Sequence, residues 1–157
     1  MALFRTMYYV NQFFAGIGGE EKADMPVGFR EEAVGPARRF QELCQGSLEV
    51  AVTAYCGDNY FAEHESDALA SILEVARKYG VSMLVAGPAF GAGRYGFACV
   101  EICHFLNISL NIPCISGMSV ESPGVELYRQ YKDKGVFLIP TSAAVSGMGE
   151  ALSKMAR

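Results

Sequence analysis

The segment from Val81 to Gly96, VSMLVAGPAFGAGRYG, most strongly constrains what this chain can fold into. Its first six residues predict a buried strand, and the glycine-rich turn at 87–93 then leads into a helix that begins near Tyr95. Because glycine has no Cβ, backbone N–H groups in such a turn can approach a ligand closely. The helix N-terminus adds unpaired N–H groups and a positive dipole end, and Arg94 can bind a carboxylate or phosphate through two nitrogens. The segment therefore predicts a strand-to-helix turn that binds an anion.

Apolar, strand-like runs alternate with helix-like segments along the whole chain. The predicted strands are Leu3–Val10, Leu48–Tyr55, Val81–Ala86, Pro113–Gly117 and Gly135–Ile139. The predicted helices are approximately Pro36–Gln45, Ser66–Tyr79, Tyr95–Leu106, Gly124–Tyr131 and Ala143–Met155. Strands separated by single helices require right-handed crossovers and form a parallel sheet that is covered on both faces. We therefore expect residues 1–157 to form a single α/β domain, doubly wound in three α/β/α layers. Its sheet is expected to be mostly parallel and five-stranded, with flavodoxin-like or Rossmann-like topology.

Composition excludes several classes of function. The formal net charge is −4 and no basic cluster occurs, which argues against nucleic acid and anionic membranes as partners. No apolar run approaches the roughly 20 residues of a membrane-spanning helix, and the first residues lack a signal-peptide pattern. The five cysteines are scattered, which favours free thiols in a reducing cytoplasm over a disulfide framework. With only two histidines and no recognisable ligand spacing, no metal site is expected.

The ends of the predicted strands are rich in polar residues and glycine. In doubly wound sheets, ligands bind beyond the carboxyl ends of the strands, so these segments predict a shared crevice. We expect Arg94 and the N–H groups near 91–96 to hold an anion there, although Arg94 can instead brace the loop through backbone carbonyls. Asp58 or Asn59 can likewise simply cap the loop that follows them. The expected substrate-binding residues are Asn11, Gln12, Asp58, Asn59, Gly91, Gly93, Arg94, Tyr95 and Gly96.

The glycines at 91–96 match the pattern G-x-G-x-x-G. Four residues separate the predicted strand from the first of these glycines, whereas a dinucleotide site has a tight turn at this point. The next strand also ends without the acidic residue that would bind a ribose, and no Lys-Ser/Thr pair follows the glycines. NAD binding is therefore not favoured, and a P-loop is excluded.

Two cysteines are candidate reactive thiols. Cys99 falls in the first turns of the predicted helix, where the helix dipole can lower the pKa of a thiol. Cys56 ends the second predicted strand, where we expect it to be partly exposed. The alternative for Cys99 is that it is a small core residue packing the helix on the sheet. In the long stretch after the first strand, Phe13 and Phe14 are expected to line a pocket or a subunit contact, or else to enter the core.

Several long motifs resemble the selenoprotein B subunit of glycine/sarcosine/betaine reductase. They are NQFFAGIGGEEKAD at 11–24, AVGP at 33–36, CGDNYFAE at 56–63, AGPAFGAGRYG at 86–96, PGVELYR at 123–129 and SAAVSGM at 142–148. The resemblance implies an anaerobic, cytoplasmic oxidoreductase that reductively removes the amino group from glycine or an N-methylated relative. It also implies that a partner subunit holds the substrate amine on a pyruvoyl group and that a selenocysteine attacks the α-carbon.

The selenocysteine motif of this family belongs to a later half that this sequence lacks. We therefore expect no cofactor in this chain, with pyruvoyl or selenocysteine carried by a partner subunit. The expected function is that of a reductase subunit, or a short homologue, that binds a small carboxylate in the strand-end crevice. Other reductase subunits are expected partners, and the apolar chain with its paired aromatics also predicts a homo-oligomer. The alternative is a non-catalytic binding or assembly module that keeps the fold and the pocket.

Overall fold

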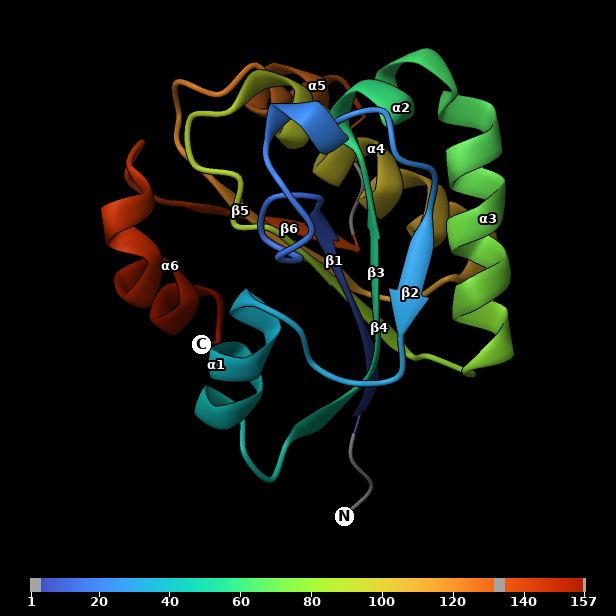
Figure 1. The fold of residues 1–157 in the computed structure, drawn as a ribbon. Coiled ribbons are helices and arrows are strands. Elements are labelled where there is room, and N and C mark those ends of the chain that lie inside the picture. Colours follow the sequence, from blue (N-terminus) through green and yellow to red (C-terminus); the bar gives the residue numbers. More distant parts are fainter. Residues whose placement is uncertain (1–3, 132–134, 157) are drawn as a thin grey trace.

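The computed structural model describes residues 4–131 and 135–156, which form a central sheet covered by helices on both faces (Figure 1). The strands are β1 (Phe4–Asn11), β2 (Gly28–Arg30), β3 (Leu48–Cys56), β4 (Met83–Ala86), β5 (Cys114–Met118) and β6 (Val136–Pro140). The helices are α1 (Pro36–Leu43), α2 (Asp58–Glu63), α3 (Glu65–Lys78), α4 (Gly93–Leu110), α5 (Gly124–Tyr131) and α6 (Met148–Met155). Two short 3-10 turns, η1 (Glu20–Lys22) and η2 (Val145–Gly147), complete the structure. Leu3, which was expected to begin the first strand, lies outside the described residues.

The sheet has six strands in the order β2-β3-β1-β4-β5-β6. Neighbouring strands are parallel, except that β2 pairs with β3 in the antiparallel direction. The five parallel strands, counted along the chain, therefore stand in the order 2-1-3-4-5. This is the flavodoxin-like order, so the prediction of a doubly wound α/β fold is confirmed and the Rossmann-like alternative is excluded.

The expected count of five strands was wrong because it missed β2. This strand has only three residues, too few for an alternating pattern to stand out in the long stretch before α1. Helix α2 was also missed, since its six residues are too few to display a helical period. Helix α6 begins at Met148, later than predicted, because the preceding residues form an extended loop and η2.

Strand β1 lies at the centre of the molecule and contributes side chains to both faces of the sheet. Met7 and Tyr9 pack beneath α2, α3, α4 and α5, whereas Tyr8 and Val10 pack beneath α1 and α6. All four side chains have no exposed surface. Successive side chains of a strand alternate between faces, so a strand covered on both sides is apolar throughout.

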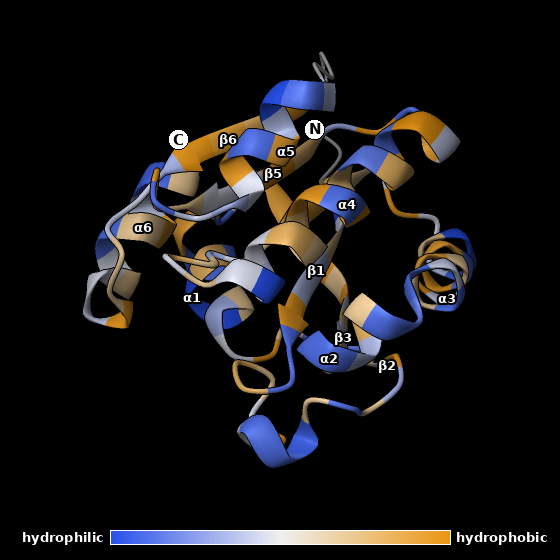
Figure 2. Cartoon of the chain, turned by 90° about the horizontal axis from the view of Figure 1, so that it is seen from above, coloured by the Kyte–Doolittle hydropathy of each residue, from blue (hydrophilic) through white to orange (hydrophobic). Residues whose placement is uncertain are grey.

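Helix α4 runs across the middle of one helical layer and is mostly apolar in Figure 2. It packs closely against α5, where Gly96 and Gly124 bring the two backbones together. A Cβ on Gly124 would lie 2.7 Å from the carbonyl oxygen of Gly96, so a larger residue does not fit there. No helix in the described part of the chain is long and apolar enough to span a membrane.

Candidate functional site

A cavity of about 380 Å³ lies at the carboxyl ends of β1 and β4. These strands are neighbours in the sheet, but the chain leaves β1 through α1 on one face and reaches β4 through α3 on the other. The helices thus diverge at this point, which is the topological switch point where doubly wound folds bind ligands. The cavity is lined by Asn11, Gln12, Phe13, Phe14, Gly19, Glu20, Asp58, Ala89, Phe90, Gly91, Ala92, Tyr95, Ala143 and Val145.

The end of β1 is tied to the beginning of α2 by buried side chains. Asn11 Nδ2 donates a hydrogen bond to Asp58 Oδ2 at 3.0 Å. The backbone N–H of Asp58 donates to Gln12 Oε1 at 3.1 Å, and the N–H of Phe14 donates to Asn11 Oδ1 at 3.0 Å. Asn11, Gln12 and Asp58 are each at least nine-tenths buried. The side-chain amides of the neighbouring residues Asn11 and Gln12 therefore fix the position of the Asp58 carboxyl in the cavity wall.

Two polar atoms of the cavity walls remain without partners. Asp58 Oδ1 and the Tyr95 hydroxyl are buried and make no hydrogen bond with any described residue. Burial raises the pKa of Asp58, while the hydrogen bond from Asn11 and the charge of Arg94 act in the opposite direction. Buried polar atoms are nearly always hydrogen-bonded, and the exceptions in native structures often mark functional sites.

The start of α4 forms another wall of the cavity. Its N-cap residue, Ala92, has no polar side chain to cap the helix, so the first N–H groups have no intrahelical or side-chain acceptor. The turn before it is held by hydrogen bonds with the end of β5 and the residue that follows this strand, from the Ala89 N–H to the Gly117 oxygen and from the Ser119 N–H to the Phe90 oxygen. Phe90 has a φ of 54°, a left-handed conformation that is unfavourable for an aromatic residue. Such strained residues cluster at functional sites, because the surrounding contacts must hold them in place.

Arg94 makes a contact that the sequence did not reveal. Its Nη2 lies 2.8 Å from both carboxylate oxygens of Glu20, which belongs to η1 and lines the cavity. Arg94 itself is not among the lining residues, and its side chain is 43% exposed. The guanidinium is therefore held by a carboxylate of the protein, rather than being free for a ligand or bound to backbone carbonyls.

The structure brings together five of the expected substrate-binding residues, namely Asn11, Gln12, Asp58, Gly91 and Tyr95. The others lie outside the cavity wall. Asn59 donates to the carboxylates of Asp24 and Glu63 at the surface. Gly93 faces Pro123, and Gly96 packs against Ser122 in the contact between α4 and α5. Ligand binding by any of these residues remains a prediction.

Residues 3–157 match the family model for glycine/sarcosine/betaine reductase selenoprotein B. The chain belongs to this family. It is 45% identical, over 99% of its length, to the glycine reductase complex component B subunit gamma of Carboxydothermus hydrogenoformans. It is 40% identical to the sarcosine reductase complex component B subunit beta, and 36% identical to the betaine reductase complex component B subunit beta, both of Peptoclostridium acidaminophilum. The match to the sarcosine protein spans 100% of the present chain, and the match to the betaine protein spans 98% of it.

The chain spans about one third of the length of these relatives, 35% for the glycine and sarcosine proteins and 34% for the betaine protein. No solved structure matches it significantly. The resemblance to the selenoprotein B family that the sequence motifs indicate is thereby confirmed.

One of the two candidate cysteines is placed differently from what the sequence predicts. Cys56 has no exposed surface and lies 3.3 Å from the Tyr9 hydroxyl, so the expectation of partial exposure was wrong. Burial raises the pKa of the Cys56 thiol to about 11. Cys99 is also fully buried, and burial raises its pKa. Helix α4 starts at Gly93, which puts Cys99 beyond the first turn where the dipole acts.

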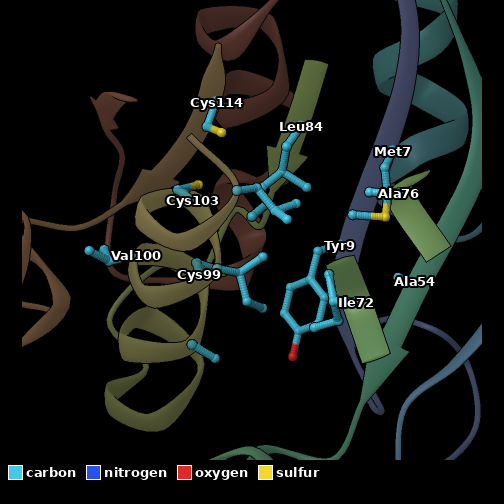
Figure 3. Packing of buried hydrophobic residues seen from close by; sticks show 14 of the residues in the cluster. Met7, Tyr9, Ala54, Ile72, Ala76, Leu84, Cys99, Val100, Cys103 and Cys114 are labelled. Atoms are coloured by element: carbon cyan, nitrogen blue, oxygen red, sulfur yellow. The ribbon is translucent and has the colours of Figure 1, made fainter. Parts of the chain in front are cut away.

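Figure 3 shows Cys99 and Cys103 on the side of α4 that faces Leu84 and Tyr9 in the core. This is the packing role that the sequence left open for Cys99. A catalytic role for Cys99 or Cys56 stays a prediction, and their burial does not favour it. Among the described residues, no group of three or more His, Cys, Asp or Glu side chains is positioned to hold a metal ion.

Sequence reasoning did not single out seven of the lining residues, which are Gly19, Glu20, Ala89, Phe90, Ala92, Ala143 and Val145. Ala143 and Val145 follow β6, which is separated from β4 by β5 in the sheet, so their approach to the cavity depends on the path of the loop. For Phe13 and Phe14 the sequence did suggest a place in a pocket, because adjacent aromatic residues directly after a strand are unusual in a surface loop. Both line the cavity, and the Phe14 ring lies 5.7 Å from the ring of Tyr95.

Proposed function

We propose that this chain is the part of a reductase component B subunit that binds a small carboxylate in the cavity between β1 and β4. The observation that carries the proposal is the uncapped N-terminus of α4 in the wall of a cavity at the switch point. A helix N-terminus favours an anion through its unpaired N–H groups and its dipole. The volume of about 380 Å³ is at the small end of the range for ligand pockets, as suits a molecule of a few non-hydrogen atoms.

The names of the relatives support this class of ligand. They are called glycine, sarcosine and betaine reductase components, and these three molecules share a carboxylate one carbon away from a nitrogen. A pocket that serves this group needs one site for the carboxylate and one for the nitrogen-bearing end. The proposed reaction is the reductive deamination of such a molecule by a complex that contains this chain and other reductase subunits in the cytoplasm.

Arg94 is proposed to assist the helix terminus in holding the carboxylate. Its ion pair with Glu20 is solvent-exposed on both sides, with side-chain exposures of 43% and 73%. Exposed ion pairs contribute only about 0–1 kcal/mol, so a ligand carboxylate can replace Glu20 at little cost. Asn11 and Gln12 would act indirectly, by fixing the Asp58 carboxyl.

The reacting groups are proposed to come from other parts of the reductase, with pyruvoyl or selenocysteine on a partner subunit. All five cysteines here are buried, and this observation also favours the second candidate, a non-catalytic binding or assembly module. The two candidates separate in a reconstituted reductase assay. If the chain supplies a substrate pocket, cavity variants that still assemble will reduce turnover. If it is an assembly module, they will leave turnover unchanged.

Calorimetric titration tests the binding site itself. The ligands are glycine, sarcosine, betaine, acetate and inorganic phosphate, and the variants are Arg94→Lys and Arg94→Ala. Arg94→Lys keeps the charge but loses the planar two-nitrogen contact, so it should weaken carboxylate binding several-fold, and Arg94→Ala should weaken it further. Arg129→Ala is the matched control, because Arg129 also pairs with a glutamate but lies on α5 outside the cavity. No measurable binding of any carboxylate to the wild type would overturn the proposal.

A further inference from the structure

Asp58 offers an unused hydrogen-bond acceptor to the cavity. Its Oδ2 is bound to Asn11, whereas Oδ1 has no partner among the described residues. The residue is only 8% exposed, so bulk water does not solvate the carboxyl freely. The N–H of Asp58 is bound to Gln12, which fixes the backbone from which the side chain projects. The free oxygen is thus held in the cavity wall and needs a hydrogen-bond donor.

The charges around the cavity indicate what kind of donor is missing. Asp58 and Glu20 contribute two carboxylates to the walls, and the nearby cation, Arg94, is bound to Glu20. The charge of Asp58 therefore has no contacting counter-ion among the described residues. Phe13 and Phe14 supply an apolar part of the same wall. A buried carboxylate is stabilised by a cation that also donates a hydrogen bond, because charge-assisted bonds are about twice as strong as neutral ones.

We infer that Asp58 determines ligand specificity by accepting a hydrogen bond from a protonated amine that carries at least one N–H. This inference rests on the proposed function, since it assigns the nitrogen end of a ligand whose carboxylate lies at the start of α4. A primary or secondary ammonium satisfies Asp58 Oδ1 in both charge and hydrogen bonding. A quaternary ammonium supplies only charge and leaves the oxygen without a donor. The cavity should therefore prefer glycine and sarcosine to betaine.

Calorimetric titration of the full chain with matched ligands tests the inference. Glycine and acetate differ in the ammonium group, sarcosine and betaine differ in the N–H, and methylammonium carries the amine alone. For the wild type we expect glycine to bind at least about tenfold more tightly than acetate, and sarcosine at least about tenfold more tightly than betaine. Asp58→Asn keeps the size of the side chain and should bring both ratios to within about twofold, without weakening acetate. Asp67→Asn removes an exposed carboxylate from α3 and is expected to change neither ratio.

The possible outcomes separate this inference from the proposed function. If acetate binds as tightly as glycine, or betaine as tightly as sarcosine, the role of Asp58 is overturned while the carboxylate site stands. If methylammonium binds and acetate does not, the carboxylate site is overturned. If none of the ligands binds, both are overturned. Should Asp58→Asn fail to fold, as judged by circular dichroism, the wild-type ratios still decide the outcome.

Discussion

Nη2 of Arg94 lies 2.8 Å from both carboxylate oxygens of Glu20, and this ion pair joins the start of α4 to the loop that follows β1. Glu20 thereby places a carboxylate of the protein beside the helix terminus where a ligand carboxylate is proposed to bind. The pair connects residues 74 positions apart in the sequence. Glu20 and the ligand would compete for one guanidinium, which makes Glu20 a direct test of the site.

Replacing Glu20 with glutamine should strengthen the binding of small carboxylates. The change removes a negative charge from the cavity wall and frees Arg94, and an exposed pair of this kind is worth about 0–1 kcal/mol. We therefore expect up to about a fivefold decrease in Kd for acetate or glycine, measured by calorimetry at low salt. Glu21→Gln serves as a control, because Glu21 is adjacent but does not line the cavity. Weaker binding to Glu20→Gln would mean that Glu20 positions Arg94 for the ligand and does not compete with it.

The five cysteines should react slowly in the folded protein. All are buried, and burial raises the pKa of Cys44, Cys56 and Cys99, so little reactive thiolate is exposed at neutral pH. Labelling with iodoacetamide at pH 7.5, followed by peptide mass spectrometry, should show rapid reaction only after unfolding in guanidinium. Cys44, with 9% exposure, should be the first to react in the native state. Rapid labelling of native Cys99 would restore the view that it is an activated thiol.

Gly124→Ala should destabilise the fold because it separates α4 from α5. The new Cβ would lie 2.7 Å from the Gly96 carbonyl oxygen, and backbone atoms cannot move aside without shifting a helix. Overpacking of this kind costs about 1–3 kcal/mol in the free energy of unfolding, measurable by urea titration. The matched control is Gly149→Ala in α6, where a Cβ meets no atom within 4 Å. It should be neutral or stabilise the protein by up to about 1 kcal/mol, because alanine favours a helix. Equal effects at the two positions would contradict the close packing.

Glu65 should make the protein less stable as the pH rises from about 4.5 to about 7. Burial raises the pKa of Glu65 to about 7, and the hydrogen bond and charge of Glu101 act in the same direction. A carboxyl whose pKa is higher in the folded state binds its proton more tightly there. Its contribution to the free energy of unfolding is therefore present at low pH and is lost as the pH passes 7. The side chain is also partly exposed to solvent, which keeps the effect small.

The comparison that isolates this effect is between the wild type and Glu65→Gln. The urea midpoint of the variant should change less between pH 4.5 and pH 7 than that of the wild type. Glu74→Gln, on the same helix, should follow the wild type. A variant with an unchanged pH dependence would show that Glu65 ionises normally.

The chain should form a homo-oligomer in isolation. Strand β6 is the edge of the sheet opposite to β2, and exposed apolar side chains include Phe13, Phe137 and Val120. Unpaired strand edges and apolar surface favour association, and a dimer is the commonest closed form. Light scattering at micromolar concentrations should give about twice the chain mass of 17.0 kDa. Phe137→Lys should shift the equilibrium toward the monomer, and a wild type that stays at 17.0 kDa would contradict the prediction.

The sequence alone determined the order of the main strands and helices and most of one cavity wall. Strands such as β3 (Leu48–Cys56) and β4 (Met83–Ala86) lie in apolar runs bounded by glycine and polar residues, and these local patterns do not depend on the rest of the chain. The rule that ligands bind at strand ends then pointed to Asn11, Gln12, Asp58, Gly91 and Tyr95, all of which line the cavity. These residues could be identified because each lies at the end of a parallel strand, in the turn that follows it or in the first turn of the next helix.

Only the tertiary structure decided the strand order, the pairing of Arg94 and the state of the thiols. A strand pattern reports the burial of a segment but not which strands are its neighbours, so the flavodoxin-like order could not be read from the sequence. The approach of Glu20 to Arg94 depends on how a long loop folds back over α4, and the burial of Cys56 and Cys99 depends on which elements cover them. The pairing of two charges and the removal of a thiol from water both depend on distances through space. The groups involved can be far apart in the sequence, so the sequence pattern does not reveal them.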